Sequence, residues 1–344
     1  MTNIETIRKF ATKLLLNEEV DLGAPLVIDE ITFVPIVKYV IPREERDYLS
    51  LSEALEEGVC KIIDKGTEVA HILFENLGDL PILIEEGEIF QGKGTQDRIS
   101  IGTVMVEPMA TVEIAVKCVH APHHLSSGAA FKYGGKASRG LLNEIRIMKF
   151  NHAAKSAPAS YIDQTRVWSK VREENIEEGV SDMTKYMESV EKRSKRAKKR
   201  TEKLNFPKNT IGMVVVNPKG EVKGLEVHRS PHNFRIRKDR IFESLENNIS
   251  WKTEGKRPYQ NAQEKVKKLF KKISELKEGK DALRQVEIDG LAINMAGVSG
   301  EAYTTTFYSA ICPSCNSKKP RKKECPHCGF LEEESDEIAY MSMY

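Results

Sequence analysis

Three features that define large functional classes are missing from this sequence. The 344-residue chain contains no run of about 18 apolar residues, so no transmembrane helix or membrane contact is expected. Its first residues do not combine a basic start with an apolar core, so a secretory signal is not expected either. There is no Gly-x-Ser-x-Gly nucleophile elbow, no phosphate-binding loop ending in Gly-Lys-Ser/Thr and no His-Glu-x-x-His pair. These absences favour a cytoplasmic protein with a non-enzymatic role.

Cysteine is scarce and unevenly placed. Of the six cysteines, Cys60 and Cys118 stand alone in apolar contexts that are typical of inert core thiols. The other four form two Cys-Pro-x-Cys pairs: Cys312, Cys315, Cys325 and Cys328. Two such knuckles supply four thiolates in the tetrahedral set that suits Zn²⁺. Because the protein fills every coordination position, the spacing predicts one structural zinc ion in a C-terminal zinc ribbon.

Charge is abundant and almost balanced overall, but it is locally asymmetric. Charged residues make up 30% of the chain and the net charge is +2. A helix predicted over residues 181–203 carries a run of cations without an acid among them, which repel one another unless a partner neutralises them. These cations are Lys192, Arg193, Lys195, Arg196, Lys198, Lys199 and Arg200. They cover most of the helix circumference, which favours phosphate-backbone contact over base recognition.

Two further basic clusters follow. A helix predicted over residues 233–245 contains Arg235 and Arg237. The loop between the two cysteine pairs contains Lys318, Lys319, Arg321, Lys322 and Lys323. Taken alone, the cluster in this loop is equally compatible with a solvated surface. Three clusters in a nearly neutral chain favour RNA or a ribosomal particle as the partner.

The pattern of apolar residues predicts an α+β fold. Short apolar runs separated by turn residues fill residues 22 to about 111, which favours an antiparallel sandwich or barrel-like core. Residues 120–140 are rich in Gly and Ser and predict a long loop. Apolar residues at helical spacing predict helices over residues 1–17, 48–56, 139–150, 163–178, 181–203, 233–245 and 262–276.

The centre of the chain is the stretch of residues 80–98. An apolar run leads into Glu85-Glu86-Gly87-Glu88, and a glycine-spaced segment ends in Gln96, Asp97 and Arg98. These polar groups form either a binding site or a polar clamp between strands. In a binding site Arg98 would hold an anion and Glu88 would act as base. A loop with His120, His123 and His124 could join such a site or bind a metal, but we favour a mobile polar loop, because no paired ligand motif of known geometry is present.

Residues 22–249 resemble the ARPP family of domains, associated with ADP-ribosylglycohydrolase and rhodanese-phosphatase proteins. The matching stretches are residues 48–55, 74–76, 80–98, 116–119, 164–171 and 211–230. The resemblance implies a mixed α/β domain that binds a ligand, with no established reaction. Where the family pattern has an acid and a Gly-Arg-Trp-like segment, this chain has His120-Ala-Pro-His-His. The basic helix and the zinc ribbon look like additions to the common domain.

These features divide the chain into four segments. They are an N-terminal helix (1–21), an ARPP-like α+β domain with the basic helix (22–250), a linker and amphipathic helix (251–282) and a zinc-ribbon domain (283–344). The leading hypothesis is a binding or regulatory factor that grips RNA or a ribosomal particle. The alternative is a nucleotide- or ADP-ribose-related sensor or enzyme that uses Glu88, Gln96, Asp97 and Arg98. The strand hairpins and the N-terminal helix are also compatible with a homodimer.

Overall fold

The protein has an α+β fold with a β-rich core, as its sequence predicts. The computed structural model describes residues 3–39, 46–66, 68–121, 125–247, 249, 257–295 and 297–344. Within these ranges lie seven α-helices and three sheets, whose strand pairs are antiparallel with a single exception. Among the described residues, no helix is both long and apolar enough to cross a membrane.

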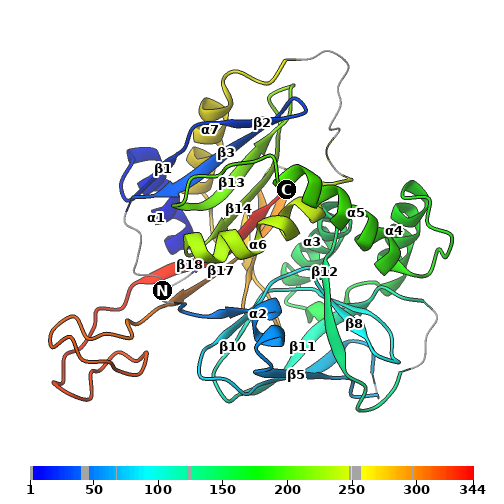
Figure 1. The fold of residues 1–344 in the computed structure, drawn as a ribbon, viewed down its shortest axis with the longest axis horizontal. Coiled ribbons are helices and arrows are strands. Elements are labelled where there is room, and N and C mark those ends of the chain that lie inside the picture. The colour runs from blue at the N-terminus through cyan, green and yellow to red at the C-terminus, as the bar shows by residue number, and fades with distance from the viewer. Residues whose placement is uncertain are drawn as a thin grey trace.

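The largest sheet brings together segments from both ends of the chain. Its strands, in spatial order, are β1 (Val20–Leu22), β3 (Ile31–Lys38), β13 (Thr210–Val216), β14 (Val222–His228), β18 (Asp336–Met343), β17 (Val298–Thr306), β16 (Leu291–Met295) and β15 (Ala282–Arg284), and β2 (Leu26–Ile28) also pairs with β3. The sequence boundaries drawn at residues 250 and 283 therefore lie within the span of one sheet. The cysteine pairs occupy a segment inserted between β17 and β18 (Figure 1).

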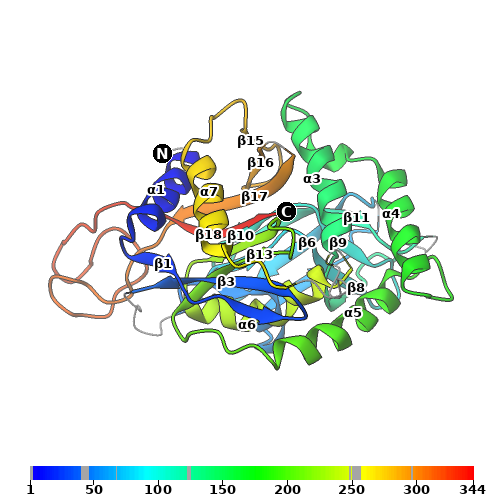
Figure 2. The same ribbon diagram turned by 90° about the horizontal axis from the view of Figure 1, so that it is seen from above.

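Helices cover both faces of this sheet. Helices α1 (Asn3–Leu16) and α7 (Ala262–Ser274) pack on one face, and α6 (Pro231–Leu245) lies on the other (Figure 2). Strand β13 shows why both faces are apolar: Val214 belongs to the α1–α7 core and Val215 to the α6 core. Successive side chains of a strand point to opposite faces, so a strand buried on both sides is apolar throughout.

Two smaller sheets form a curled half-barrel beside the large one. The first has the order β12 (Phe131–Lys136), β8 (Glu88–Gly92), β9 (Arg98–Ser100), β11 (Thr111–Cys118), β6 (His71–Asn76) and β5 (Cys60–Ile63). The second has the order β10 (Val104–Val106), β7 (Ile82–Ile84) and β4 (Leu49–Ser50). Helix α2 (Leu51–Glu56) packs on their shared apolar core and begins with a capping box at Ser50.

The remaining helices cover the other side of the half-barrel. Helices α3 (Arg139–Ala153), α4 (Gln164–Glu177) and α5 (Tyr186–Thr201) follow one another along the chain. Ser138 caps α3 by accepting a 3.0 Å hydrogen bond from Leu141 N, and Asp163 caps α4 through Thr165 N at 2.8 Å. The predicted helices are therefore present, with ends shifted by a few residues.

The predicted loop over residues 120–140 is wrong in part, because it contains strand β12. This strand pairs with β8 and carries a bulge between Tyr133 and Gly135. Gly135 has a φ of 106°, and a Cβ there would lie 2.6 Å from Glu243 Oε1. The glycine is therefore required by a close packing contact rather than by a flexible loop. Residues 122–124, which include His123 and His124, lie outside the described residues, as do residues 251–256 at the start of the predicted linker segment.

Candidate metal centre and buried polar sites

The two cysteine pairs form knuckles with the same backbone geometry. In the first knuckle Asn316 N donates to Cys312 O at 2.9 Å, and in the second Gly329 N donates to Cys325 O at 2.9 Å. Asn316 and Gly329 have positive φ values of 56° and 71°. Each knuckle is closed by a short antiparallel bridge. The repeated turn directs both thiols of each pair to a common point.

The four thiols are arranged as a metal would require. Cys312 Sγ lies 3.7 Å from Cys328 Sγ, Cys315 Sγ lies 3.8 Å from Cys325 Sγ, and all four Sγ atoms lie within 4.8 Å of one another. A regular tetrahedron with metal–sulfur bonds of about 2.3 Å has sulfur–sulfur edges of about 3.8 Å. A disulfide would need an S–S distance of about 2.0 Å. The cluster can therefore hold one metal ion.

The basic loop between the knuckles is partly used to build the ribbon. Lys319 is buried, and its Nζ lies 3.0 Å from Glu332 Oε2. Arg321 contacts Asp47, and its Nη2 donates to Arg46 O at 2.9 Å, so it joins the ribbon to the body of the protein. The exposed cations of the loop are Lys318, Lys322 and Lys323. Lys323 is also paired with Glu334 at 3.0 Å.

The basic helix α5 is likewise divided between cations that are bonded within the protein and cations that are exposed. Arg193 is fully buried and donates to Tyr186 Oη at 3.1 Å. Lys192 donates to Glu178 O at 2.8 Å, and Arg196 makes a two-bond contact with the Glu178 carboxylate. Arg200 Nε lies 3.7 Å from Glu246 Oε1. The side chains of Lys195, Lys198 and Lys199 are exposed, as is that of Lys192.

The two predicted cations of α6 differ in their surroundings. Arg235 is exposed, whereas Arg237 is 4% exposed and pairs with the buried Glu85. The ribbon and helix α5 lie toward opposite ends of the longest axis of the molecule (Figure 1). The predicted nucleic-acid residues are therefore not brought together into one groove.

Helix α7 carries a basic surface that is not among the predicted basic clusters. Its exposed side holds Lys267, Lys268, Lys271 and Lys272. Its buried side packs Val266 and Phe270 into the core shared with α1. Like charges four residues apart on a helix are mildly destabilising. The signal was visible as two Lys-Lys pairs on either side of Leu269 and Phe270.

The carboxylates of the turn between β7 and β8 point into the protein. Glu85 is 2% exposed, receives a 2.8 Å hydrogen bond from Lys136 Nζ and pairs with Arg237. Burial alone would raise the pKa of Glu85, but the positive charges of Arg237 and Lys136 outweigh it and lower that pKa to about 2. Glu85 is therefore an ionised carboxylate held by two buried cations.

The neighbouring acids of the turn differ in protonation. Glu86 is fully buried between Arg146 and Lys149 of α3, which outweigh the effect of burial and lower its pKa. Among the described residues no cation is paired with Glu88 in this way, and burial and the adjacent Glu85 charge raise the pKa of Glu88 to about 8. Glu88 Oε2 accepts a 2.9 Å hydrogen bond from Glu85 N. Glu88 is therefore mostly neutral near pH 7.

This ionic cluster joins the half-barrel to the large sheet. Lys149 contacts Glu301 of β17 as well as Glu86. Arg139 of α3 donates to Lys223 O at 2.9 Å and lies 3.5 Å from Glu226 of β14. Its guanidinium also stacks on the ring of Tyr344, 3.7 Å from the centroid. These contacts have the arrangement of a polar clamp, in which the charges are paired across the interface of two sheets.

The predicted ligand residues separate into two groups. Arg98 is fully buried, donates to Gln96 O at 3.0 Å and lies 3.7 Å from Asp64 Oδ2. Asp97 Oδ1 accepts a 2.9 Å hydrogen bond from Gly92 N, and its Oδ2 lies 3.5 Å from His120 Nδ1. These residues lie near Asp64 and His120, whereas Glu88 belongs to the cluster around Glu85.

The isolated Cys118 lies beside Arg98, a contact that its apolar strand context did not predict. Its Sγ donates to His120 O at 2.9 Å. Its backbone N donates to Gln164 Oε1 at 3.1 Å, and its backbone O accepts from Gln164 Nε2 at 2.7 Å. Burial raises the pKa of the Cys118 thiol, although the Arg98 charge opposes this effect. A buried, protonated thiol of this kind is a poor nucleophile.

Fold and sites together define an α+β protein with a buried ionic clamp and a C-terminal four-cysteine metal site. The profile of the ARG and Rhodanese-Phosphatase-superfamily-associated Protein domain, ARPP-1, matches residues 19–299, and the chain belongs to this family. The matched range is longer than the resemblance over residues 22–249, since it also includes α7, β15 and β16. It ends before the four cysteines of the metal site. Searches of curated proteins and of solved structures gave no match.

Proposed function

We propose that this protein is a cytoplasmic, non-enzymatic factor that binds RNA, most directly the RNA of a ribosomal particle, through its ribbon. The observation that carries the proposal is the ribbon itself. Its knuckles hold Lys318, Lys322 and Lys323 exposed on a projection at one end of the molecule. A rigid projection with exposed ammonium groups suits contact with phosphates, which does not require base recognition.

We further propose that zinc is the metal of the four-cysteine site. Four thiolates are soft ligands, and the sulfur–sulfur distances of 3.7 and 3.8 Å fit a tetrahedral ion with no open position. Cys312, Cys315, Cys325 and Cys328 would hold it. The bound ion would contribute stability to a segment that has little apolar core of its own, and it would perform no chemistry on a substrate.

The exposed lysines of α5 and α7 support the proposal from two other surfaces. Lys195, Lys198 and Lys199 of α5 have exposed side chains, as do the four lysines on the outer side of α7. Since the ribbon and α5 lie far apart, they suit a large RNA surface better than a short oligonucleotide. The small-ligand alternative has less support, because Glu88, Gln96, Asp97 and Arg98 are all less than 8% exposed and bonded within the protein.

The proposal is tested by co-sedimentation with ribosomes and subunits over a salt series. The test variant replaces Lys318, Lys322 and Lys323 with Gln. The matched control replaces three exposed lysines elsewhere: Lys61, Lys132 and Lys155. Losing three phosphate contacts should lower affinity at least tenfold and reduce the slope of log affinity against log salt by about 2. No binding by the wild type, or equal binding by the test and control variants, would reject the proposal.

A further inference from the structure

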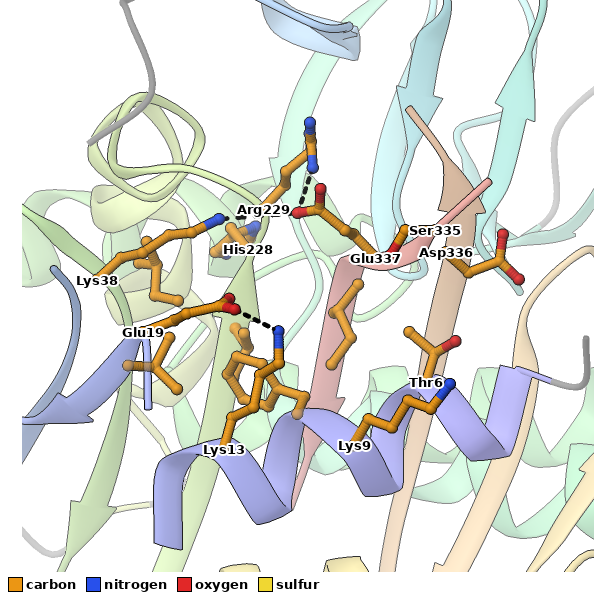
Figure 3. A pocket seen from close by; sticks show the side chains of 15 residues that line it. Thr6, Lys9, Lys13, Glu19, Lys38, His228, Arg229, Ser335, Asp336 and Glu337 are labelled. Atoms are coloured by element: carbon orange, nitrogen blue, oxygen red, sulfur yellow. Dashed lines mark hydrogen bonds and ion pairs between the residues drawn. The ribbon is translucent and has the colours of Figure 1, made fainter. Parts of the chain in front are cut away.

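A cavity of about 350 Å³ lies where α1 crosses the ends of β3, β14 and β18 (Figure 3). Its apolar lining comes from Phe10, Val20, Ile211, Val227 and Ile338. The volume is within the usual range for small-molecule sites. The rest of the lining is polar or charged, so the cavity offers both apolar and polar surface. Two of its residues contact features described above: His228 lies 3.6 Å from Glu85 of the clamp, and Arg229 pairs with Asp47, which also pairs with Arg321 of the ribbon.

Three cations from three different elements converge at this cavity. Lys13 extends from α1, Lys38 from β3, and Arg229 from the end of β14, as Figure 3 shows. Lys38 Nζ lies 3.7 Å from Glu337 Oε2, whereas Arg229 Nη1 lies 2.5 Å from the same atom. Lys13 pairs with Glu19 at 2.7 Å. The Lys38 contact is a loose one, so its ammonium is the least satisfied of the three.

The three cations also change the pKa of Glu337, whose carboxylate lies among them. Burial acts to raise the pKa of Glu337, but the charge of Arg229 outweighs burial and lowers that pKa. Lys38 and Lys13 act on it in the same direction. Glu337 is therefore an ionised carboxylate shared among several cations, rather than one side of a simple ion pair.

The charged side chains that line the cavity do not balance. Lys9, Lys13, Lys38 and Arg229 carry four positive charges, and Glu19, Asp336 and Glu337 carry three negative charges, which leaves one positive charge. His228 also lines the cavity and adds no charge, because burial lowers its pKa to about 3. Outside the lining, Asp47 and Arg321 cancel each other. Glu5 lies 3.4 Å from Lys9, but both side chains are more than half exposed, so water and salt screen that pair.

We propose that this cavity binds an organic monoanion with an apolar body, such as a carboxylate carried on an alkyl chain or ring system. The single excess charge would be matched by one anionic group beside Lys38 and Lys13. The apolar lining would take the rest of the molecule, because transfer of apolar surface from water into the cavity is favourable. A dianion would bring one negative charge more than the cavity matches, and a neutral molecule would leave the excess positive charge of the cavity uncompensated.

Two fluorescent probes with the same ring system test this proposal on the full-length, metal-loaded protein. The anionic probe is 8-anilinonaphthalene-1-sulfonate, and the neutral probe is N-phenyl-1-naphthylamine. We expect the anionic probe to bind one site at least tenfold more tightly than the neutral probe. Octanoate should displace it and 1-octanol should not. Equal affinities, or no displacement by octanoate, would overturn the proposal.

The location is tested with Lys38→Gln and Lys13→Gln, and with Lys208→Gln as a control at an exposed lysine elsewhere. Each cavity variant should weaken the anionic probe about fivefold to tenfold at low salt and leave the neutral probe within twofold. The control should change neither. If Lys38→Gln does not fold, Lys13→Gln makes the same comparison, since its side chain is the more exposed of the two. Unchanged binding of the anionic probe to folded cavity variants would exclude this cavity as the site.

Discussion

Arg321 in the ribbon forms an ion pair with Asp47, a residue 274 positions earlier in the chain. The other oxygen of Asp47 accepts a 2.6 Å hydrogen bond from Arg229 Nε, and the Arg229 guanidinium stacks on the ring of Phe307 at 3.8 Å. Asp47 therefore links the ribbon loop to the end of β14. Arg321 therefore docks the ribbon, and only the exposed lysines of the loop are assigned to the proposed RNA contact.

Replacing Asp47 with Asn should loosen the ribbon while the sheet stays folded. The change removes the charge that two guanidinium groups share, and partly exposed pairs of this kind contribute about 1 kcal/mol or less each. We expect hydrogen exchange over residues 307–335 to become several-fold faster, with little change in melting temperature. Lys323→Gln, which breaks the exposed pair with Glu334, is the control. Identical exchange in both variants would mean that Asp47 does not hold the ribbon.

Removing the metal should unfold the ribbon selectively. Cys315→Ser takes away one of four ligands, and a four-thiolate site depends on all of them. We expect metal content to fall from one ion per chain toward zero, and trypsin to cleave between residues 312 and 328. Strands β17 and β18 should stay protected, because their pairing and core contacts do not involve the cysteines. Cys60→Ser, at an isolated cysteine, should keep its metal. Full metal content in Cys315→Ser would contradict the assignment.

The parts of the fold that depend on local pattern were predictable. The helices follow from apolar spacing, and α3 and α4 begin at capping residues, Ser138 and Asp163, that are visible in the sequence. The knuckles follow from cysteine spacing alone. Strand β12 was missed because its two glycines are typical of loops, whereas here one of them allows close packing against Glu243.

The role of the buried turn could not be predicted from its own residues. Glu85-Glu86-Gly87-Glu88 has the composition of a solvated turn, yet all three acids are buried. Their partners come from distant segments: Arg146 is 60 residues away and Lys149 is 63 residues away. The same limit applies to Arg193 and Arg237, whose burial depends on acids brought near by packing. A run of basic residues in a sequence therefore predicts a larger exposed basic surface than the folded protein has, because the acids that pair with these residues come from distant segments.

The raised pKa of Glu88 should make stability depend on pH. The folded state binds this proton more tightly than the unfolded state, whose carboxyl titrates near 4.5, so the folded pKa of about 8 costs stability as pH rises through that window. Glu88→Gln has no such proton and its amide oxygen can still accept from Glu85 N. Relative to wild type, the variant should become more stable between pH 5 and pH 8, by on the order of a few kcal/mol.

Urea unfolding at a series of pH values measures this difference. The control is Glu333→Gln, which changes an exposed acid and should give a constant offset. A difference between wild type and Glu88→Gln that does not grow with pH would show that Glu88 ionises normally in the folded protein.

Breaking the clamp should be far more damaging than breaking a surface pair. Glu86→Gln leaves the buried cations Arg146 and Lys149 without their shared carboxylate, and removing one partner of a buried ion pair typically costs about 3–5 kcal/mol. Glu19→Gln, which breaks the exposed pair with Lys13, should cost less than about 1 kcal/mol. Urea unfolding of both variants at pH 7 makes the comparison. Similar small losses would mean that Glu301 or water satisfies the two cations when Glu86 is gone, and that the turn is not the structural centre of the interface.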